Sequence, residues 1–172
     1  MGLPPNHAFE GGVFRSGLTK EAVYILDPSE SYRQRGNPLL KVHVLDELYH
    51  HSSNVAHGVE VPAGARLLFT NGQVGTKLDG TTPKTTAEQA EVVFTRVEAV
   101  LAAANMALTD IVRLTVFLTD QEDVGTFVKA RDRVMGGHKP GAIILVVKAL
   151  ARPELKIEIE TIAAKVDADP AA

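Results

Sequence analysis

Two stretches of the chain show the three- and four-residue spacing of apolar side chains that is typical of amphipathic helices. Before the first stretch, Thr85 and Glu88 form a capping-box signature, in which the threonine hydroxyl accepts the third helical amide and the glutamate reaches back. The first apolar stripe comprises Ala90, Val93, Phe94, Val97, Val100, Leu101 and Ala104. The second, which opens at Asp123, comprises Val124, Phe127, Val128, Val134 and Met135. We expect Asn105 to cap the first helix in a left-handed conformation and Gly136 to stop the second.

Five segments have the pattern of β-strands, namely residues 55–61, 66–70, 111–118, 142–150 and 155–161. The first two are joined by Pro62-Ala63-Gly64, which predicts a hairpin. The run 142–150 is almost continuously apolar, as is typical of a strand that is covered on both faces. The last segment alternates, with Leu155, Ile157 and Ile159 on one face and Lys156, Glu158 and Glu160 on the other.

The order of these elements predicts an α+β fold, with one mixed sheet that carries two helices on one face. The other sheet face also carries apolar residues in the run 142–150, and the chain has no third long helix to cover them. Association of subunits is the economical way to bury that face.

Residues 1–53 form an expected N-terminal extension of different composition. They contain four prolines around two short apolar runs, 22–26 and 39–45, each a candidate strand. They also hold five of the nine phenylalanines and tyrosines of the chain, so we expect this arm to pack against the body rather than to be disordered. The body is expected over residues 54–165, followed by a flexible tail over 166–172.

Length, charge and cysteine content exclude several classes of protein. The chain has 172 residues, enough for one domain, a net charge of −3 and no cysteine, which excludes disulfides and thiolate chemistry. The acidic balance argues against a nucleic-acid partner, and the absence of a long apolar run argues against a membrane. We find no secretory signal and expect a cytoplasmic protein.

Few residues point to chemistry by their local pattern alone. His50, His51 and His57 lie close together in sequence, but their spacing matches no standard metal site, so we predict no metal and treat them as solvated loop histidines. Glu158 and Glu160 share one strand face and are either catalytic carboxylates or a surface ion-pair group.

Four segments taken in order are more informative: FTNGQV (69–74), TAEQA (86–90), IVRLTVFLTD (111–120) and LARPELKIEIE (150–160). Over about residues 54–165 the chain resembles the Rid family, also called YjgF-like and formerly L-PSP endoribonuclease. The resemblance implies a chorismate-mutase-like fold and a homotrimer with clefts between neighbouring subunits. It also implies hydrolysis, without a cofactor, of enamines and imines formed from amino acids to a keto acid and ammonia, with the small-molecule ligand bound in the cleft.

The resemblance assigns roles residue by residue. It makes Glu158 the catalytic residue that positions the attacking water, and its ligand-binding positions are Asn71, Gly72, Phe117, Ala142 and Ile144. Three of these depart from the family pattern: Asn71 replaces a serine, Ile144 replaces a cysteine but keeps its amide, and Ala142 replaces the arginine that holds the substrate carboxylate. A methyl group cannot make that bidentate contact. Lys148, on the same strand face by parity, is roughly 20 Å farther along the strand and cannot stand in.

Three readings of the function follow. The first is a Rid-family hydrolase or deaminase acting on an imine-like or related carbonyl-derived metabolite. The second is a non-catalytic small-molecule-binding trimer that has kept the fold. The ribonuclease label is the weakest, because the body lacks a basic stripe with interleaved aromatic residues. We expect the arm either to approach the cleft mouth, where Arg33, Arg35, His50 or His51 would supply a cation, or to add strands to a distant sheet edge.

Overall fold

The computed structural model describes residues 39–49 and 54–167. The strands are β1 (Lys41–His43), β2 (Gly58–Glu60), β3 (Arg66–Phe69), β4 (Gln73–Val74), β5 (Ile111–Leu118), β6 (Gly141–Val146) and β7 (Ile157–Lys165). The helices are α1 (Thr86–Ala103) and α2 (Val124–Met135), with short 3₁₀ turns at Leu108–Asp110 and Gln121–Asp123. Both predicted helices and the predicted strand 111–118 are confirmed.

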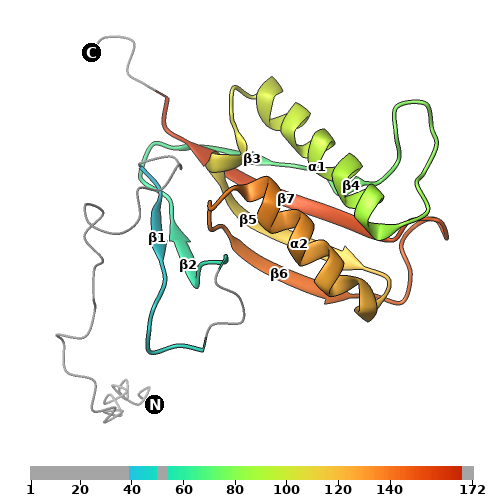
Figure 1. Cartoon of the computed structure of the whole chain (residues 1–172). Helices are drawn as coiled ribbons and strands as arrows, with labels where there is room; N and C mark the ends of the chain where they lie inside the picture. The colour runs from blue at the N-terminus through green and yellow to red at the C-terminus, as the bar shows by residue number, and fades with distance from the viewer. Residues whose placement is uncertain (1–38, 50–53, 168–172) are drawn as a thin grey trace, which may run out of the picture.

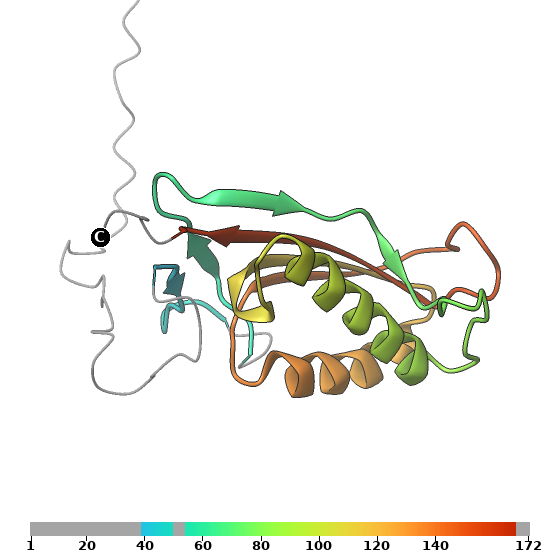
Figure 2. The same ribbon diagram turned by 90° about the horizontal axis from the view of Figure 1, so that it is seen from above.

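The main sheet has five strands and is mixed. Its order is β3-β7-β5-β6, and the short β4 also pairs with β7. The pair β5–β6 is parallel, whereas β3, β4 and β5 all run antiparallel to β7. Both helices lie on the same face of this sheet, as Figures 1 and 2 show from two directions. The predicted α+β architecture is therefore confirmed, and the opposite face, which we call the open face, has no helix over it.

The core lies between the helices and the sheet. Val93, Val97 and Leu101 of α1 are fully buried against the odd-numbered positions of β7, such as Ile157 and Ile159. The rings of Phe94 and Phe127 stack across the two helices, with centroids 6.3 Å apart. Burial of each such side chain contributes on the order of 1.5–3 kcal/mol, so this face holds the fold together.

The helix ends follow the sequence signals. The Thr85 side chain accepts a hydrogen bond from the amide of Glu88, and the Glu88 carboxylate accepts one from the amide of Thr85. Asn105 has a φ of 55° just after α1, and Gly136 has a φ of 56° at the end of α2. Asn and Gly adopt this left-handed conformation at little cost. The chain can therefore turn after each helix and return to the sheet.

The predicted hairpin between 55–61 and 66–70 is wrong. The chain does turn after β2, where the amide of Ala65 donates to the carbonyl of Pro62. However, β2 pairs with β1 in a separate two-stranded sheet, and β3 pairs with β7. The apolar run 39–45 of the arm thus provides the partner strand for β2.

The run 142–150 also differs from the prediction. The strand β6 stops at Val146, so Lys148 lies beyond its end and not on it. In the single chain β6 is an edge strand, and Ile143, Leu145 and Val146 are 38%, 41% and 50% exposed. This strand is therefore not covered on both faces by its own chain.

The two ends of the body are both joined to the main sheet. Ala56 forms a parallel bridge with Gly141, which fixes the start of the body beside β6. At the other end β7 continues to Lys165, and Asp167 forms an ion pair with Arg66 of β3. Several predictions concern residues that the structure does not describe. These are the candidate strand 22–26, the cations Arg33, Arg35, His50 and His51, and the end of the tail. No helix in the described part of the chain is long and apolar enough to span a bilayer.

Candidate functional site

Glu158 lies in a row of side chains that crosses the open face. It pairs with Val74 of β4 on one side and with Phe117 of β5 on the other, and Phe117 pairs in turn with Leu145 of β6. Residues that are directly opposite in a sheet point to the same face. Since Ile157 and Ile159 are buried under the helices, this Glu158 row faces away from them.

Gly72 lies directly against the Glu158 carboxylate. A Cβ atom at Gly72 would overlap Oε1 and Cδ of Glu158, so only glycine leaves room for the carboxylate in this position. Within the described residues no hydrogen bond or ion pair joins this carboxylate to another side chain. Its oxygens therefore stay available to a water molecule or a ligand.

Gln89 of α1 holds the backbone that leads into β7. It is fully buried, and its Nε2 donates to the carbonyls of Pro83, at 2.7 Å, and Glu154, at 2.8 Å. Its Oε1 accepts the amide of Lys156 at 2.8 Å. A Cβ atom at Gly75 would meet the Gln89 side chain at 2.5 Å, so α1 packs directly on the chain after β4. One side chain thus ties the chain after β4 to the start of β7.

Charged residues occupy the neighbouring rows of the open face. Glu160 pairs with Thr115 in the next row, and Thr115 pairs with Ile143. Arg113 pairs with Ile162 one row farther along, so Glu160 lies between Arg113 and the Glu158 row. In this register Arg113 is a diagonal neighbour of Glu160 and lies two rows from Glu158.

Lys156 lies on the other side of the Glu158 row. Its carbonyl accepts the amide of Thr119 at 3.1 Å, which extends the β5–β7 pairing by one residue beyond the end of β5 and the start of β7. Leu155 is buried on the helix side, so alternation places the half-buried Lys156 on the open face, two residues from Glu158.

The structure brings together only some of the expected site residues. Glu158, Phe117 and Gly72 meet on the open face, and Asn71 is exposed beside them. The side chains of Ala142 and Ile144 do not join them: these residues pair with Leu114 and Val116 and pack against the core on the helix side.

Two β6 residues that the sequence reasoning missed face the site instead. They are Ile143 and Leu145, the partners of Thr115 and Phe117. Ile143 and Leu145 alternate along β6 in step with Thr115 and Phe117 on β5, so they point to the same face. The sequence shows this alternation, but the face can be assigned only when the β5–β6 register is known.

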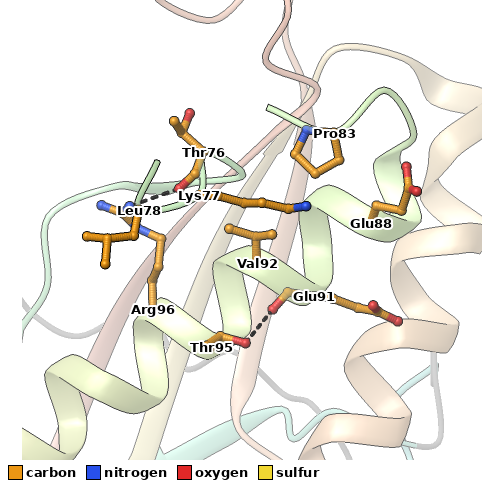
Figure 3. Close-up of a pocket in the computed structure, with 9 residues that line it drawn as sticks. All are labelled: Thr76, Lys77, Leu78, Pro83, Glu88, Glu91, Val92, Thr95 and Arg96. Atoms are coloured by element: carbon orange, nitrogen blue, oxygen red, sulfur yellow. Dashed lines mark hydrogen bonds between the residues drawn. The ribbon is translucent and has the colours of Figure 1, made fainter. Parts of the chain in front are cut away.

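Two surface grooves lie away from Glu158. One, of about 580 Å³, separates α1 from the loop after β4; Figure 3 shows Arg96 reaching across it to the carbonyl of Thr76, and the acids Glu88 and Glu91 lie along it. Another, of about 630 Å³, lies between β6 and α2 and includes Ala142 and the buried Arg131. The first has mixed charge, the second follows the β6 edge of the sheet, and Glu158 lines neither of them.

The described residues contain no cluster of three metal-ligating side chains. Nδ1 of His57 accepts the amide of Leu45 at 3.1 Å, which commits that nitrogen to the backbone. The neighbouring histidines of the sequence pattern lie outside the described part of the chain.

Comparison with known proteins shows the family of the chain. Residues 53–165 match the family model described as Endoribonuclease L-PSP. Protein DfrA of Myxococcus xanthus is 35% identical over 63% of this chain and 82% of its own length. TdcF of Escherichia coli K12, whose name assigns it to the reactive intermediate deaminases, is 30% identical over 58% of this chain and 79% of its own length.

Solved structures share the fold. The crystal structure of E. coli TdcF with bound serine superposes with a TM-score of 0.56, at 30% identity over 64% of this chain and 87% of that one. YyfB of Yersinia pestis, described as a protein of the conserved Rid family, superposes with a TM-score of 0.66, at 25% identity over 74% of this chain and 99% of that one. The chain therefore belongs to the Endoribonuclease L-PSP family, the family of the Rid and YjgF proteins.

Proposed function

We propose that the protein is a cofactor-independent hydrolase of the Rid type, which converts an imine or its enamine tautomer into a carbonyl compound and ammonia. The observation that carries the proposal is the Glu158 carboxylate. It lies against Gly72 on the open face, without a hydrogen bond or ion pair to any other side chain in the described part of the chain. The name of the relative TdcF and the serine in its crystal structure support a small ligand of this kind.

Glu158 is the catalytic residue of this proposal. Its carboxylate orients a water molecule and accepts a proton as the oxygen attacks the imine carbon. The nitrogen takes up protons as the carbon–nitrogen bond breaks, so that one water and one imine give one carbonyl compound and one ammonia. Asn71, Gly72 and Phe117 border the same place, and the amide of Ile144 remains a candidate donor.

We further propose that the open face is buried in a homotrimer, with the ligand clefts between subunits. Apolar side chains gather on this face and are exposed in the single chain: Leu67 is 52% exposed, Phe69 67%, Ile143 38% and Leu145 41%. Exposed apolar side chains that gather on one face are typical of an interface. The partner subunits would also enclose Glu158 and limit the access of bulk water.

A non-catalytic small-molecule-binding trimer is the second candidate. Three of the four residues in the Glu158 row are apolar, and the β6 positions that face it are Ile143 and Leu145 rather than an arginine. A cleft of this composition can bind a ligand without hydrolysing it. A cytoplasmic location and the absence of nucleic-acid and membrane partners remain predictions.

Ammonia release separates these candidates. The purified protein is mixed with a panel of imines and enamines generated in place, and ammonia is followed against the uncatalysed rate. We expect acceleration by the wild-type protein. We also expect turnover of small α-imino acids to be slower than in a relative that has the arginine, by about ten- to a hundredfold, because a charged hydrogen bond of this kind is worth about 1.5–3 kcal/mol. Binding without acceleration would favour the second candidate.

A further inference from the structure

Resting on the proposed function, we infer that Lys156 is the residue that binds the substrate carboxylate, so that the site takes a carboxylate-bearing imine in spite of its apolar β6. Lys156 has no role in the family pattern carried over above. It would act as a specificity-determining residue, with Glu158 carrying the chemistry.

The position of Lys156 follows from the pairing of β5 and β7. The pair Phe117–Glu158 and the hydrogen bond from the Thr119 amide to the Lys156 carbonyl continue one ladder, so Lys156 and Glu158 point to the same face. Their Cα atoms are separated by roughly 7 Å, the length of two residues in a strand. A carboxylate and an imine carbon are adjacent in an α-imino acid, so one small ligand can reach both side chains.

The other basic residues near the site are less suitable. Arg113 is two rows from Glu158, with Glu160 as its diagonal neighbour. The Arg152 guanidinium donates to the Thr76 hydroxyl and forms an ion pair with Glu154 at 3.3 Å. Lys148 lies past the end of β6.

Lys156 itself combines a fixed backbone with an available ammonium group. Its amide is held by the fully buried Gln89 at 2.8 Å. No ion pair of its side chain is found among the described residues, although Glu154 and Glu158 are both two residues away in sequence. The Lys156 backbone is fixed, the residue is half-buried, and its ammonium group is available. A lysine held in this way can bind a carboxylate as a point charge.

A site with Lys156 is expected to bind the substrate carboxylate less tightly than a site with an arginine. A lysine offers a single compact charge instead of a planar pair of donors, so it holds the carboxylate less firmly and with less directional control. We therefore expect a higher KM for α-imino acids than in an arginine-containing relative, while a preference for the carboxylate persists.

The test compares two imines that differ only in the carboxylate. An amino acid oxidase acting on valine supplies 2-imino-3-methylbutanoate, and a flavin amine oxidase acting on isobutylamine supplies the imine without the carboxylate. The variants are Lys156→Met, which removes the charge, Lys156→Arg, which restores it, and Lys148→Met as the matched lysine control.

Lys156→Met is expected to raise KM for the carboxylate-bearing imine about tenfold or more, with kcat and the other imine little affected. Lys156→Arg is expected to restore the affinity, and Lys148→Met to behave as wild type. Equal effects of Lys156→Met on both imines, or none on either, would overturn the inference.

A binding measurement keeps the inference testable if the protein hydrolyses nothing. NMR titration with 2-oxobutanoate, and with butanone as the carboxylate-free control, reports affinity directly. Tighter binding of 2-oxobutanoate that is lost in Lys156→Met supports the inference even if the proposed hydrolysis fails. Failure of the wild-type protein to bind 2-oxobutanoate at millimolar concentration, or unchanged binding in the variant, contradicts it.

Discussion

The carboxylate of Glu158 occupies the space in which any residue other than glycine at position 72 would place its Cβ atom. Because the overlapping atoms are the flexible end of the glutamate, Gly72→Ala should displace the carboxylate rather than unfold the protein. We expect a large loss of turnover with a change in unfolding free energy of about 1 kcal/mol or less. Ammonia release and urea denaturation measure the two effects.

Gly58→Ala is the matched control, since a Cβ atom at Gly58 meets nothing within 4 Å. This variant should keep the wild-type turnover and stability. Full activity of Gly72→Ala would mean that the position of the Glu158 carboxylate does not matter for the reaction.

Gln89 is expected to stabilise the fold through its buried side chain. Gln89→Met keeps the shape but leaves the Pro83 and Glu154 carbonyls and the Lys156 amide without their partner. We expect a loss of about 2–4 kcal/mol in unfolding free energy, measured by urea denaturation. The exposed Gln121→Met should change little, and a similar small effect for Gln89→Met would show that these groups find other partners.

His138 gives the stability of the protein a pH dependence. It is buried, its Nε2 donates to the Ile111 carbonyl at 2.6 Å, and burial lowers its pKa below the usual 6.5. The unfolded chain therefore binds more protons than the folded one as the pH falls through about 6.5, and the unfolding free energy decreases.

His138→Gln keeps a donor for Ile111 but does not titrate in this range. Thermal denaturation between pH 8 and pH 5 should show a smaller loss of stability for this variant than for the wild-type protein. Parallel curves for the two proteins would exclude His138 as the cause.

The open face is predicted to form the subunit interface. Phe69→Lys places a charge in its apolar patch and should convert the trimer to smaller species, as measured by light scattering at micromolar concentration. Leu78→Lys is the control, because Leu78 is fully exposed but lies in the loop after β4, away from the open face. A wild-type protein that is a stable monomer at this concentration would remove both the interface and the intersubunit cleft.

Local patterns predicted the parts of the fold that local interactions specify. The capping box at Thr85 and the two apolar stripes define α1 and α2, and alternation along β7 correctly separates the buried Ile157 and Ile159 from Glu158. The hairpin could not be predicted reliably, because the choice of partner for β2 and β3 depends on the arm and on β7, which are distant in sequence.

The contacts within the site likewise depend on pairing between strands that are distant in sequence. Glu158 and Gly72 carried recognisable sequence signals, but their contact depends on the register of β4 and β7. Ala142 was expected to line the site, but the parallel pairing of β5 and β6 turns its side chain toward the helices and that of Ile143 toward the Glu158 row. Strand parity is set by hydrogen bonding across the sheet, and a single sequence does not reveal it.

The central claim is that the Glu158 carboxylate drives imine hydrolysis. The most direct measurement is ammonia release by Glu158→Gln beside Glu98→Gln, which removes a carboxylate of the same size from the exposed side of α1. The amide at position 158 keeps the shape but cannot accept the proton of the attacking water. We predict that Glu158→Gln loses turnover by about a hundredfold or more with fold and assembly intact, while Glu98→Gln keeps the wild-type rate. Equal turnover in the two variants would contradict the account.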